Sequence, residues 1–256
     1  MSVPCPIVSG MSDSAKIIAV VGAVGGAGAS SLAASVANAM AAGGRRVVLV
    51  DVCAFGPGIE VLLGIESEPG ARWPDLVDAR GEVETNIALA LPQWQQVPVL
   101  SMSRKQPAPA SDEVTLDVCA SLLRNGHDVV IDAPGPAAWT PGLKALLADV
   151  DNLFVVVPDT LPGAAGAAAV TAGAAESLPI ARGGGGAARA SLVVRARRGS
   201  RTAPADFAEL TGWPVAARYV SERGLDIAID LGAGPVAKHA KRLRAVGAQL
   251  AAQVAV

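Results

Sequence analysis

The sequence predicts an α/β fold: one domain with a mostly parallel central sheet and helices on both of its faces. Continuous apolar runs, such as Arg45–Asp51 and Asn152–Pro158, are typical of strands buried on both faces of a parallel sheet. Helical patterns alternate with these runs, which favours parallel strands joined by helices. The chain has 256 residues, of which 51% are hydrophobic, so it is long enough to bury one sizeable core.

Charge and cysteine content narrow the class of protein. The formal net charge is −2, so no bulk electrostatic attraction to nucleic acid is expected. The three cysteines, Cys5, Cys53 and Cys119, are irregularly spaced and form no metal-binding pair such as C-x-x-C. This pattern is typical of free thiols in a reducing compartment, and we expect a cytoplasmic protein.

The N-terminal residues 1–15 lack the basic and apolar regions of a signal peptide, and we expect a flexible lead-in before a domain over 16–256. The stretch Ile17–Ala42 carries no charge and is long enough to span a bilayer. It is rich in Gly, Ala and Ser, and its large apolar residues gather at its start. We therefore do not expect it to be a transmembrane helix.

The chain is organised around the stretch that begins at Lys16. We expect a strand over Lys16–Val21, a glycine-rich turn over Gly22–Ser30 and a helix over Ser31–Ala42. A strand that passes through glycines into a helix is typical of phosphate-binding loops, because the N–H groups and the dipole of the helix attract an anion. The predicted phosphate-binding residues are Gly25, Gly26, Ala27, Gly28, Ala29, Ser30 and Ser31.

The turn matches the P-loop pattern G-x-x-x-x-G-K-[ST] in shape but not in charge. Gly28 takes the place of the last glycine, and Ala29 stands where the phosphate-binding lysine belongs. Ser30 supplies the hydroxyl that would hold Mg²⁺. The ligand that this loop would accept is ATP or ADP with Mg²⁺, bound weakly, and the alternative is that no cofactor binds.

Two acidic residues follow predicted strands and belong to the predicted cofactor site. Asp51 ends one strand, and Asp132 ends another within His127–Gly135. The carboxyl ends of parallel strands meet at one edge of the sheet, so both should lie near the glycine-rich turn. If Mg-nucleotide binds, Ser30 and Asp132 are the expected metal ligands. An alternative for Asp51 is a capping acid at the strand end.

The segment VVGAVGGAGASSLAASVA resembles the deviant Walker A loop of the ParA/MinD ATPases, whose usual form is K-G-G-x-G-K-[ST]. This resemblance implies a single P-loop NTPase-like domain and a dimer that responds to ATP. Val24 and Ala29 replace both family lysines. Asp51 matches the start of the family's D-x-D motif, with Cys53 at its second acid, and Asp132 matches the acid of the D-x-P-x-G segment.

A longer segment, GIEVLLGIESEPGARWPDL over Gly58–Leu76, is similar to a narrower branch of CpaE/TadZ-like proteins. Within it, the closest resemblance is to actinobacterial septum site-determining (Ssd-like) proteins. This implies a role in placing a division septum or a Tad-type pilus, through protein partners and recruitment to the membrane or cell pole. We expect Trp73 and Leu76 to pack against the sheet. For Trp73, contact with a partner is the alternative.

Two functions compete on these residues. The first is a degenerate positioning or regulatory factor with weak or no ATP hydrolysis, which the missing lysines favour because ATP brings about four negative charges to the loop. The second is an active, dimerising switch ATPase of the CpaE/TadZ type. Arg195 or Arg197, after a predicted strand, is an alternative source of positive charge.

The remaining chain provides three further expectations. A helix is predicted around Ala88–Trp94 and a strand over Val97–Met102. Ser111 is the predicted N-cap of a helix that runs to Arg124. The tail, residues 236–256, is an amphipathic helix that either packs on the domain or binds a membrane surface. Its apolar stripe consists of Leu243, Val246, Leu250 and Val254, next to the basic residues Lys238, Lys241, Arg242 and Arg244.

Overall fold

The computed structural model describes residues 15–53, 58–77, 87–103, 110–179, 189–200, 202–236 and 240–254, so nearly all of the expected lead-in lies outside it. One eight-stranded sheet runs through these residues in the order β3-β4-β2-β5-β1-β6-β7-β8. Every neighbouring pair is parallel except β3 with β4. The strands are β1 Ile17–Gly22, β2 Val47–Asp51, β3 Gln93–Trp94, β4 Val97–Leu100, β5 Asp128–Ala133, β6 Asn152–Pro158, β7 Arg189–Ala196 and β8 Val215–Val220.

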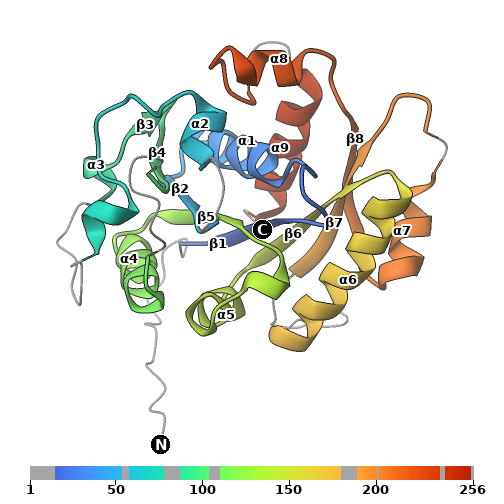
Figure 1. The fold of residues 1–256 in the computed structure, drawn as a ribbon, viewed down its shortest axis with the longest axis horizontal. Coiled ribbons are helices and arrows are strands. Elements are labelled where there is room, and N and C mark those ends of the chain that lie inside the picture. The colour runs from blue at the N-terminus through green and yellow to red at the C-terminus, as the bar shows by residue number, and fades with distance from the viewer. Residues whose placement is uncertain are drawn as a thin grey trace, which may run out of the picture.

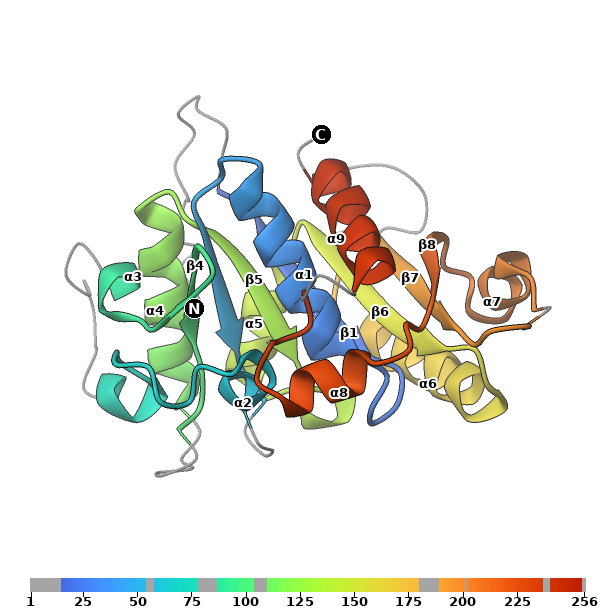
Figure 2. The same ribbon diagram turned by 90° about the horizontal axis from the view of Figure 1, so that it is seen from above.

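Helices cover both faces of the sheet, as the sequence predicts (Figure 1). The helices of the described residues are α1 Ala29–Ala42, α2 Ile59–Leu63, α3 Ile87–Ala90, α4 Asp112–Arg124, α5 Pro141–Ala148, α6 Leu161–Ser177, α7 Pro204–Thr211, α8 Leu225–Asp230 and α9 Lys241–Val254. α1 and α9 lie side by side on one face, with α2 and α8 near the carboxyl ends of the strands (Figure 2). α4, α5, α6 and α7 pack on the other face.

The central strands are buried because their side chains are apolar in both directions. Every residue of β2 and β5 is buried, and β1 and β6 are buried except for their last residue. Alternate side chains point to opposite faces and join two separate apolar clusters, one beneath α1 and α9 and the other beneath α4, α5 and α6. This burial fixes the register that brings the strand ends together at one edge of the sheet.

Helix α4 begins and ends where the sequence predicts. The Ser111 hydroxyl accepts a hydrogen bond from the backbone N–H of Val114, and the helix then runs to Arg124. Gly126 has φ +73°, a left-handed conformation that favours glycine and ends the helix. Here local capping chemistry alone determines both helix boundaries.

The prediction for residues 88–94 was wrong in part. Helix α3 ends at Ala90, and Trp94 lies in strand β3, paired antiparallel with Val97. Pro92 cannot continue a helix without losing a backbone hydrogen bond. A tight turn at Gln95, with φ +55°, then returns the chain along β4. The predicted strand over Val97–Met102 is shorter and ends at Leu100.

Helix α9 packs on the domain, so the packing alternative for the tail is confirmed over Lys241–Val254. All four residues of its apolar stripe are buried. A Cβ atom at Gly247 would lie 2.3 Å from Ser35 Oγ and 2.7 Å from the Ser35 carbonyl oxygen, so α9 lies directly against α1. The Ser35 hydroxyl donates to the Leu243 carbonyl at 3.0 Å. Membrane binding through this stripe would require α9 to detach.

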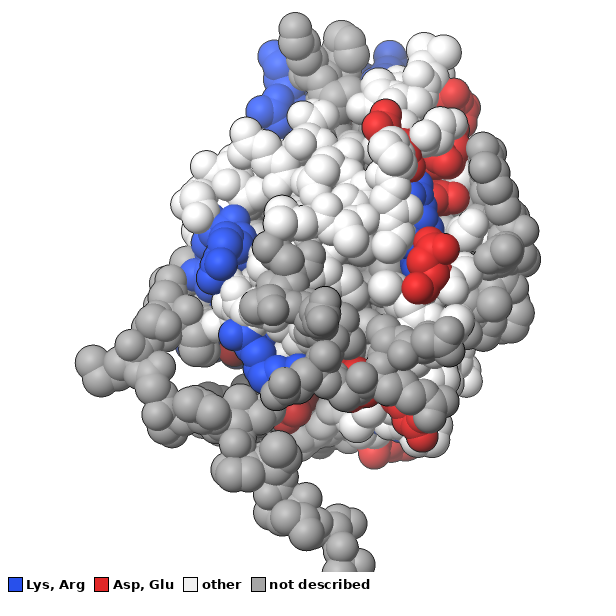
Figure 3. All heavy atoms as spheres, turned by 90° about the vertical axis from the view of Figure 1, so that its left-hand side faces the viewer, with Lys and Arg blue, Asp and Glu red and all other residues white. Residues whose placement is uncertain are grey.

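The surface over α3 and α4 carries both signs of charge. Basic and acidic side chains are scattered over this face, in places side by side, and neither kind covers its described part (Figure 3). Within the described residues, no helix has both the length and the apolar character that a bilayer crossing requires.

Candidate nucleotide site

The glycine-rich loop joins β1 to α1 at the carboxyl edge of the sheet. Helix α1 begins at Ala29, two residues before the predicted start. Gly26 and Gly28 have φ +70° and +98°, conformations that side chains other than glycine rarely adopt. No side chain caps this helix, and its first turn holds no acidic residue. The first N–H groups of α1 therefore point out of the loop without a side-chain partner, as a phosphate cradle requires.

Backbone hydrogen bonds hold the loop against the sheet. The N–H of Ala23 donates to the carbonyl of Val156 in β6, and the N–H of Ala27 donates to the carbonyl of Val24. Ala27 is buried, whereas Gly25 and Gly26 are exposed. The predicted binding residues 25–31 thus form one turn that is fixed at its base and open at its glycines.

Ser30 and Asp132 lie together, as the predicted metal ligands should. The Ser30 hydroxyl donates a hydrogen bond to the Asp132 carboxylate, which is 3% exposed at the end of β5. Burial, with the negative charge of Asp51, raises the pKa of Asp132 to about 7, and the Ser30 hydrogen bond offsets part of this rise. A cation beside Asp132 would stabilise the ionised carboxylate.

Asp51 lies in register with Asp132 on the adjacent strand, but both of its oxygens serve the backbone. They accept hydrogen bonds from the N–H groups of Cys53 and Ile59, each at 2.9 Å. Burial raises the pKa of Asp51, and these two hydrogen bonds lower it in part. Asp51 therefore acts as the strand-end cap of the alternative interpretation, and it also adds negative charge beside Asp132.

The donor set at this point suits a hard divalent cation. Ligand atoms of Asp51, Cys53 and Asp132 lie within 4.8 Å of one another, and the Ser30 hydroxyl contacts Asp132. Carboxylate and hydroxyl oxygens are the ligands that Mg²⁺ prefers. Burial raises the pKa of the Cys53 thiol, so this soft group stays protonated and is a poor ligand for Mg²⁺. Mg²⁺ therefore fits at Ser30 and Asp132.

Neither family lysine position supplies a charge. Ala29 is the first residue of α1, and Val24 packs against α6 of its own chain. A Cβ atom at Gly166 of α6 would lie 2.6 Å from Val24 Cγ1 and 2.3 Å from the Ala23 carbonyl oxygen. The loop and α6 are thus in close contact at position 24.

An arginine of β7 lies beside the loop. A Cβ atom at Gly28 would lie 3.0 Å from Arg195 Nη1 and 3.7 Å from the Tyr219 hydroxyl. Burial raises the pKa of Tyr219 to about 12, and the charge of nearby Arg195 works in the opposite direction. Arg197 is exposed. From the sequence, Arg195 and Arg197 are equal candidates for the source of positive charge. The structure places Arg195 beside Gly28 and leaves Arg197 exposed.

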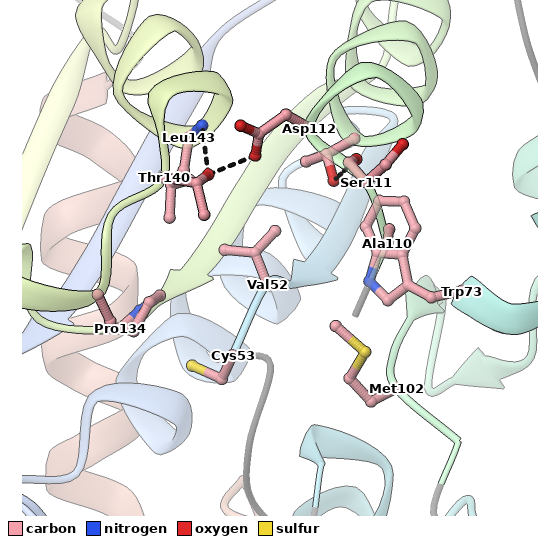
Figure 4. Close-up of a pocket in the computed structure, with 12 residues that line it drawn as sticks. Val52, Cys53, Trp73, Met102, Ala110, Ser111, Asp112, Pro134, Thr140 and Leu143 are labelled. Atoms are coloured by element: carbon pink, nitrogen blue, oxygen red, sulfur yellow. Dashed lines mark hydrogen bonds between the residues drawn. The ribbon is translucent and has the colours of Figure 1, made fainter. Parts of the chain in front are cut away.

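A pocket of about 630 Å³ lies beside the carboxylate cluster, between the ends of β2 and β4 and the first turns of α4 and α5 (Figure 4). Val52, Trp73 and Met102 give it an apolar lining, and Cys53 lies at its edge. The Trp73 indole N–H donates to the Asp51 carbonyl at 2.7 Å, and the side chain is 1% exposed. The expected packing role of Trp73 is therefore confirmed.

The segment Gly58–Leu76 forms a compact unit that supports Asp51. Arg72 Nε donates to Glu60 Oε2 at 3.0 Å, and both residues are buried. Arg72 Nη2 also donates to the Ile65 carbonyl at 3.1 Å. This ion pair joins α2 to the short 3₁₀ helix η1, Trp73–Leu76, so the most distinctive stretch of the sequence shapes the wall of the site.

Known proteins share this fold. The ParA family model, described as NUBPL iron-transfer P-loop NTPase, matches residues 13–131. A ParA family ATPase from Chlorobium tepidum TLS superposes with a TM-score of 0.70 at 16% identity, over 92% of this chain and 98% of that chain. The family model thus matches slightly less than half of this chain, and the solved structure shares its fold. In the glycine-rich loop, Val24 and Ala29 stand at the positions where the ParA/MinD pattern has lysines.

Two MinD structures resemble the fold of this chain to a similar degree. MinD in the MinC:MinD cell division protein complex of Aquifex aeolicus has a TM-score of 0.68 at 18% identity, over 92% of this chain and 95% of that chain. The septum site-determining protein MinD with Mg-ADP, from Pyrococcus horikoshii OT3, has a TM-score of 0.67 at 17% identity, over 94% and 96%. At these identities the likeness establishes the fold.

A sequence relative comes from Mycobacterium tuberculosis. The uncharacterized protein Rv3660c of strain H37Rv is 35% identical over 153 residues, which are 59% of this chain and 42% of the mycobacterial protein. The match therefore spans less than half of that relative's length.

Proposed function

We propose that this protein is a degenerate ParA/MinD-like positioning or regulatory factor that binds Mg-nucleotide weakly and hydrolyses little or no ATP. One observation carries this proposal. The loop keeps its open amides and the Ser30–Asp132 contact, whereas Val24 and Ala29 leave both lysine positions without charge. The cradle has the shape for phosphates but lacks the usual cations.

The charge balance supports weak binding. Removing a charge-assisted hydrogen bond costs about 1.5–3 kcal/mol, which corresponds to a roughly 10- to 100-fold loss of affinity. The backbone N–H groups of residues 25–31 would still bind phosphate oxygens, and Ser30 and Asp132 would hold Mg²⁺. The metal would supply electrostatic stabilisation of the phosphates, as it does for other P-loop proteins.

The acidic positions support slow hydrolysis. Each carboxylate oxygen of Asp51 already accepts a hydrogen bond, from the N–H of Cys53 or of Ile59, which reduces its capacity to accept from a water molecule in the site. Cys53 stands at the second position of the D-x-D motif and carries a protonated thiol. Neither position therefore offers a free carboxylate to orient an attacking water.

We place this factor in septum placement or Tad-type pilus assembly, where it would act through protein partners and as a homodimer. The resemblance of Gly58–Leu76 to Ssd-like and CpaE/TadZ-like proteins supports this assignment. The MinD structures, one of them in complex with MinC, are of cell division proteins with the same fold. Partners would recruit the chain from the cytoplasm to the membrane or cell pole.

An active, dimerising switch ATPase of the CpaE/TadZ type is the second candidate. One observation favours it: Arg195 lies beside Gly28, so a cation is present at the loop. The two candidates differ in turnover and in affinity for nucleotide, and one titration series separates them.

Calorimetry with Mg-ATP and Mg-ADP, together with phosphate release, tests the proposal. We expect weak binding and a turnover well below about 1 per minute, the slow end of switch NTPases. Ala29→Lys should raise the affinity at least about 10-fold, because it restores a charged contact to the phosphates. Ala42→Lys adds the same charge at the exposed end of α1 and should leave the affinity unchanged.

Tight binding with turnover above that rate would favour the switch ATPase. No binding of either nucleotide to the unaltered chain would contradict both candidates. An Ala29→Lys variant that binds no better than Ala42→Lys would show that the loop does not present position 29 to phosphates.

A further inference from the structure

We propose that Arg195 is the phosphate-binding cation of this chain and takes over the role of the absent P-loop lysine from a different strand. The inference rests on the proposed binding of a nucleotide and names the residue that neutralises its phosphates. It is carried by the position of the Arg195 guanidinium, by the lack of an acidic partner for it within the described ranges and by the close approach that Gly28 allows.

The side chain of Arg195 reaches the loop from two strands away, since β6 lies between β7 and β1. A Cβ atom at Gly28 would lie 3.0 Å from Arg195 Nη1 and 3.7 Å from its Cδ, so the arginine lies along the face of this glycine. Gly28 directly precedes Ala29, the lysine position. The guanidinium is therefore near the point in the sequence where the missing charge belongs.

Arg195 has no acidic partner among the residues that the structure describes. The ion pairs between described residues are Lys16–Asp151, Arg45–Asp128, Arg72–Glu60 and Arg218–Asp159. Asp159 lies close to the Arg195 backbone, because its N–H donates to the Arg195 carbonyl. Its carboxylate, however, accepts from the Ser200 hydroxyl and pairs with Arg218.

Partial burial of the Arg195 guanidinium removes some of its hydration, and no described acidic residue offsets this cost. A bound anion would offset it. Here the same side chain lies beside uncapped N–H groups of α1, which also attract an anion. Two independent positive features thus converge on one loop. A di- or triphosphate can accept hydrogen bonds from the α1 N–H groups and from the guanidinium. A guanidinium can bind two phosphate oxygens at once.

The arginine Arg197 provides a matched control. It lies two residues further along the same segment, is exposed, and has the same charge. Arg195→Gln and Arg197→Gln therefore change the net charge equally, but only the first removes the guanidinium beside Gly28. Any loss that is specific to Arg195→Gln reflects position, and not the overall charge of the protein.

Calorimetry of the full chain with Mg-ADP, and with adenosine as a ligand without phosphates, tests the proposal. We expect Arg195→Gln to weaken Mg-ADP binding about 10- to 100-fold and Arg197→Gln to change it less than about twofold. Adenosine binding should be the same in both variants. Ala29→Lys added to Arg195→Gln should recover most of the loss, because it returns a cation to the loop.

Equal affinities of Arg195→Gln and Arg197→Gln for Mg-ADP would overturn the assignment of Arg195 and leave the proposed function intact. An equal loss for adenosine and Mg-ADP would also overturn it, because Arg195 would then support the loop without binding phosphate. If the unaltered chain binds no Mg-ADP, the proposed function itself fails.

Chemical labelling of the unaltered protein keeps the test independent of folding of the variants. Phenylglyoxal modifies accessible arginines, and mass spectrometry reads each site separately. We expect Mg-ADP to protect Arg195 and to leave Arg197 reactive. Equal labelling of Arg195 with and without saturating Mg-ADP would overturn the proposal.

Discussion

Replacing Gly247 by valine is expected to destabilise the protein by at least about 3 kcal/mol and to detach α9 from α1. A Cβ atom at this position would lie 2.3 to 2.8 Å from atoms of Ser35, two of them in the backbone, so α1 cannot move aside locally. The helix must shift outward and expose part of an apolar stripe that includes Leu243 and Leu250. Urea unfolding followed by circular dichroism measures the effect.

Ala248→Val is the control for this prediction, because it adds the same side chain at an exposed position one residue further on. It should change the free energy of unfolding by less than about 1 kcal/mol, mostly through the lower helix propensity of valine. A Gly247→Val variant with the unfolding midpoint of the unaltered chain would contradict the close contact of the two helices. Pelleting of the unaltered protein with anionic vesicles would contradict the burial of the α9 stripe in solution.

Asp132→Asn is expected to stabilise the metal-free and nucleotide-free protein at pH 8 by about 2–4 kcal/mol. The pKa of Asp132 is raised to about 7 in the folded protein, against an ordinary value of 3.8. The folded state therefore binds the proton more tightly than the unfolded state. The stability that this group contributes is present below about pH 4 and is lost as the pH rises through about 7. An asparagine keeps an oxygen for the Ser30 hydroxyl without the charge.

Unfolding in EDTA at pH 5.5, 7 and 8.5 measures this dependence, which should be much smaller in Asp132→Asn than in the unaltered chain. Asp51, whose pKa burial also raises, accounts for the rest. The control is Asp128→Asn, at the other end of β5, where the carboxylate accepts a hydrogen bond from Arg45. It should destabilise the protein at each pH, because it breaks a buried ion pair. Equal pH dependence in Asp132→Asn and the unaltered chain would contradict the raised pKa.

The sequence was sufficient for the fold wherever local chemistry and burial agree. The apolar run Asn152–Pro158 has the same bounds as strand β6, and Ser111 caps α4 at the predicted residue. The hairpin of β3 and β4 was missed because its turn depends on Gln95, a residue that rarely adopts a positive φ. No glycine or asparagine marks this turn, so only the pairing of Trp94 with Val97 reveals it.

The candidate site was predictable only where it follows from strand order. Parallel strands bring Asp132 to Ser30, as the sequence suggested. The two hydrogen bonds that Asp51 accepts, from the N–H groups of Cys53 and Ile59, could not be predicted from the sequence. They require Ile59 to lie beside the end of β2. Arg195 could not be chosen over Arg197, because the choice depends on which side chain of the β7 end faces the loop. Such contacts join residues that lie far apart in sequence.

Val24 packs against Gly166 of its own chain, so occupancy of the nucleotide site should not depend on protein concentration. Val24 stands at the first lysine position of the K-G-G-x-G-K-[ST] pattern, and its side chain is held by a helix of its own chain. The proposed cation also belongs to the same polypeptide as the loop it serves. Ligand capture would then be complete in a single molecule. At a fixed free concentration of Mg-ADP, the fraction of protein that is bound should not change between micromolar and nanomolar protein.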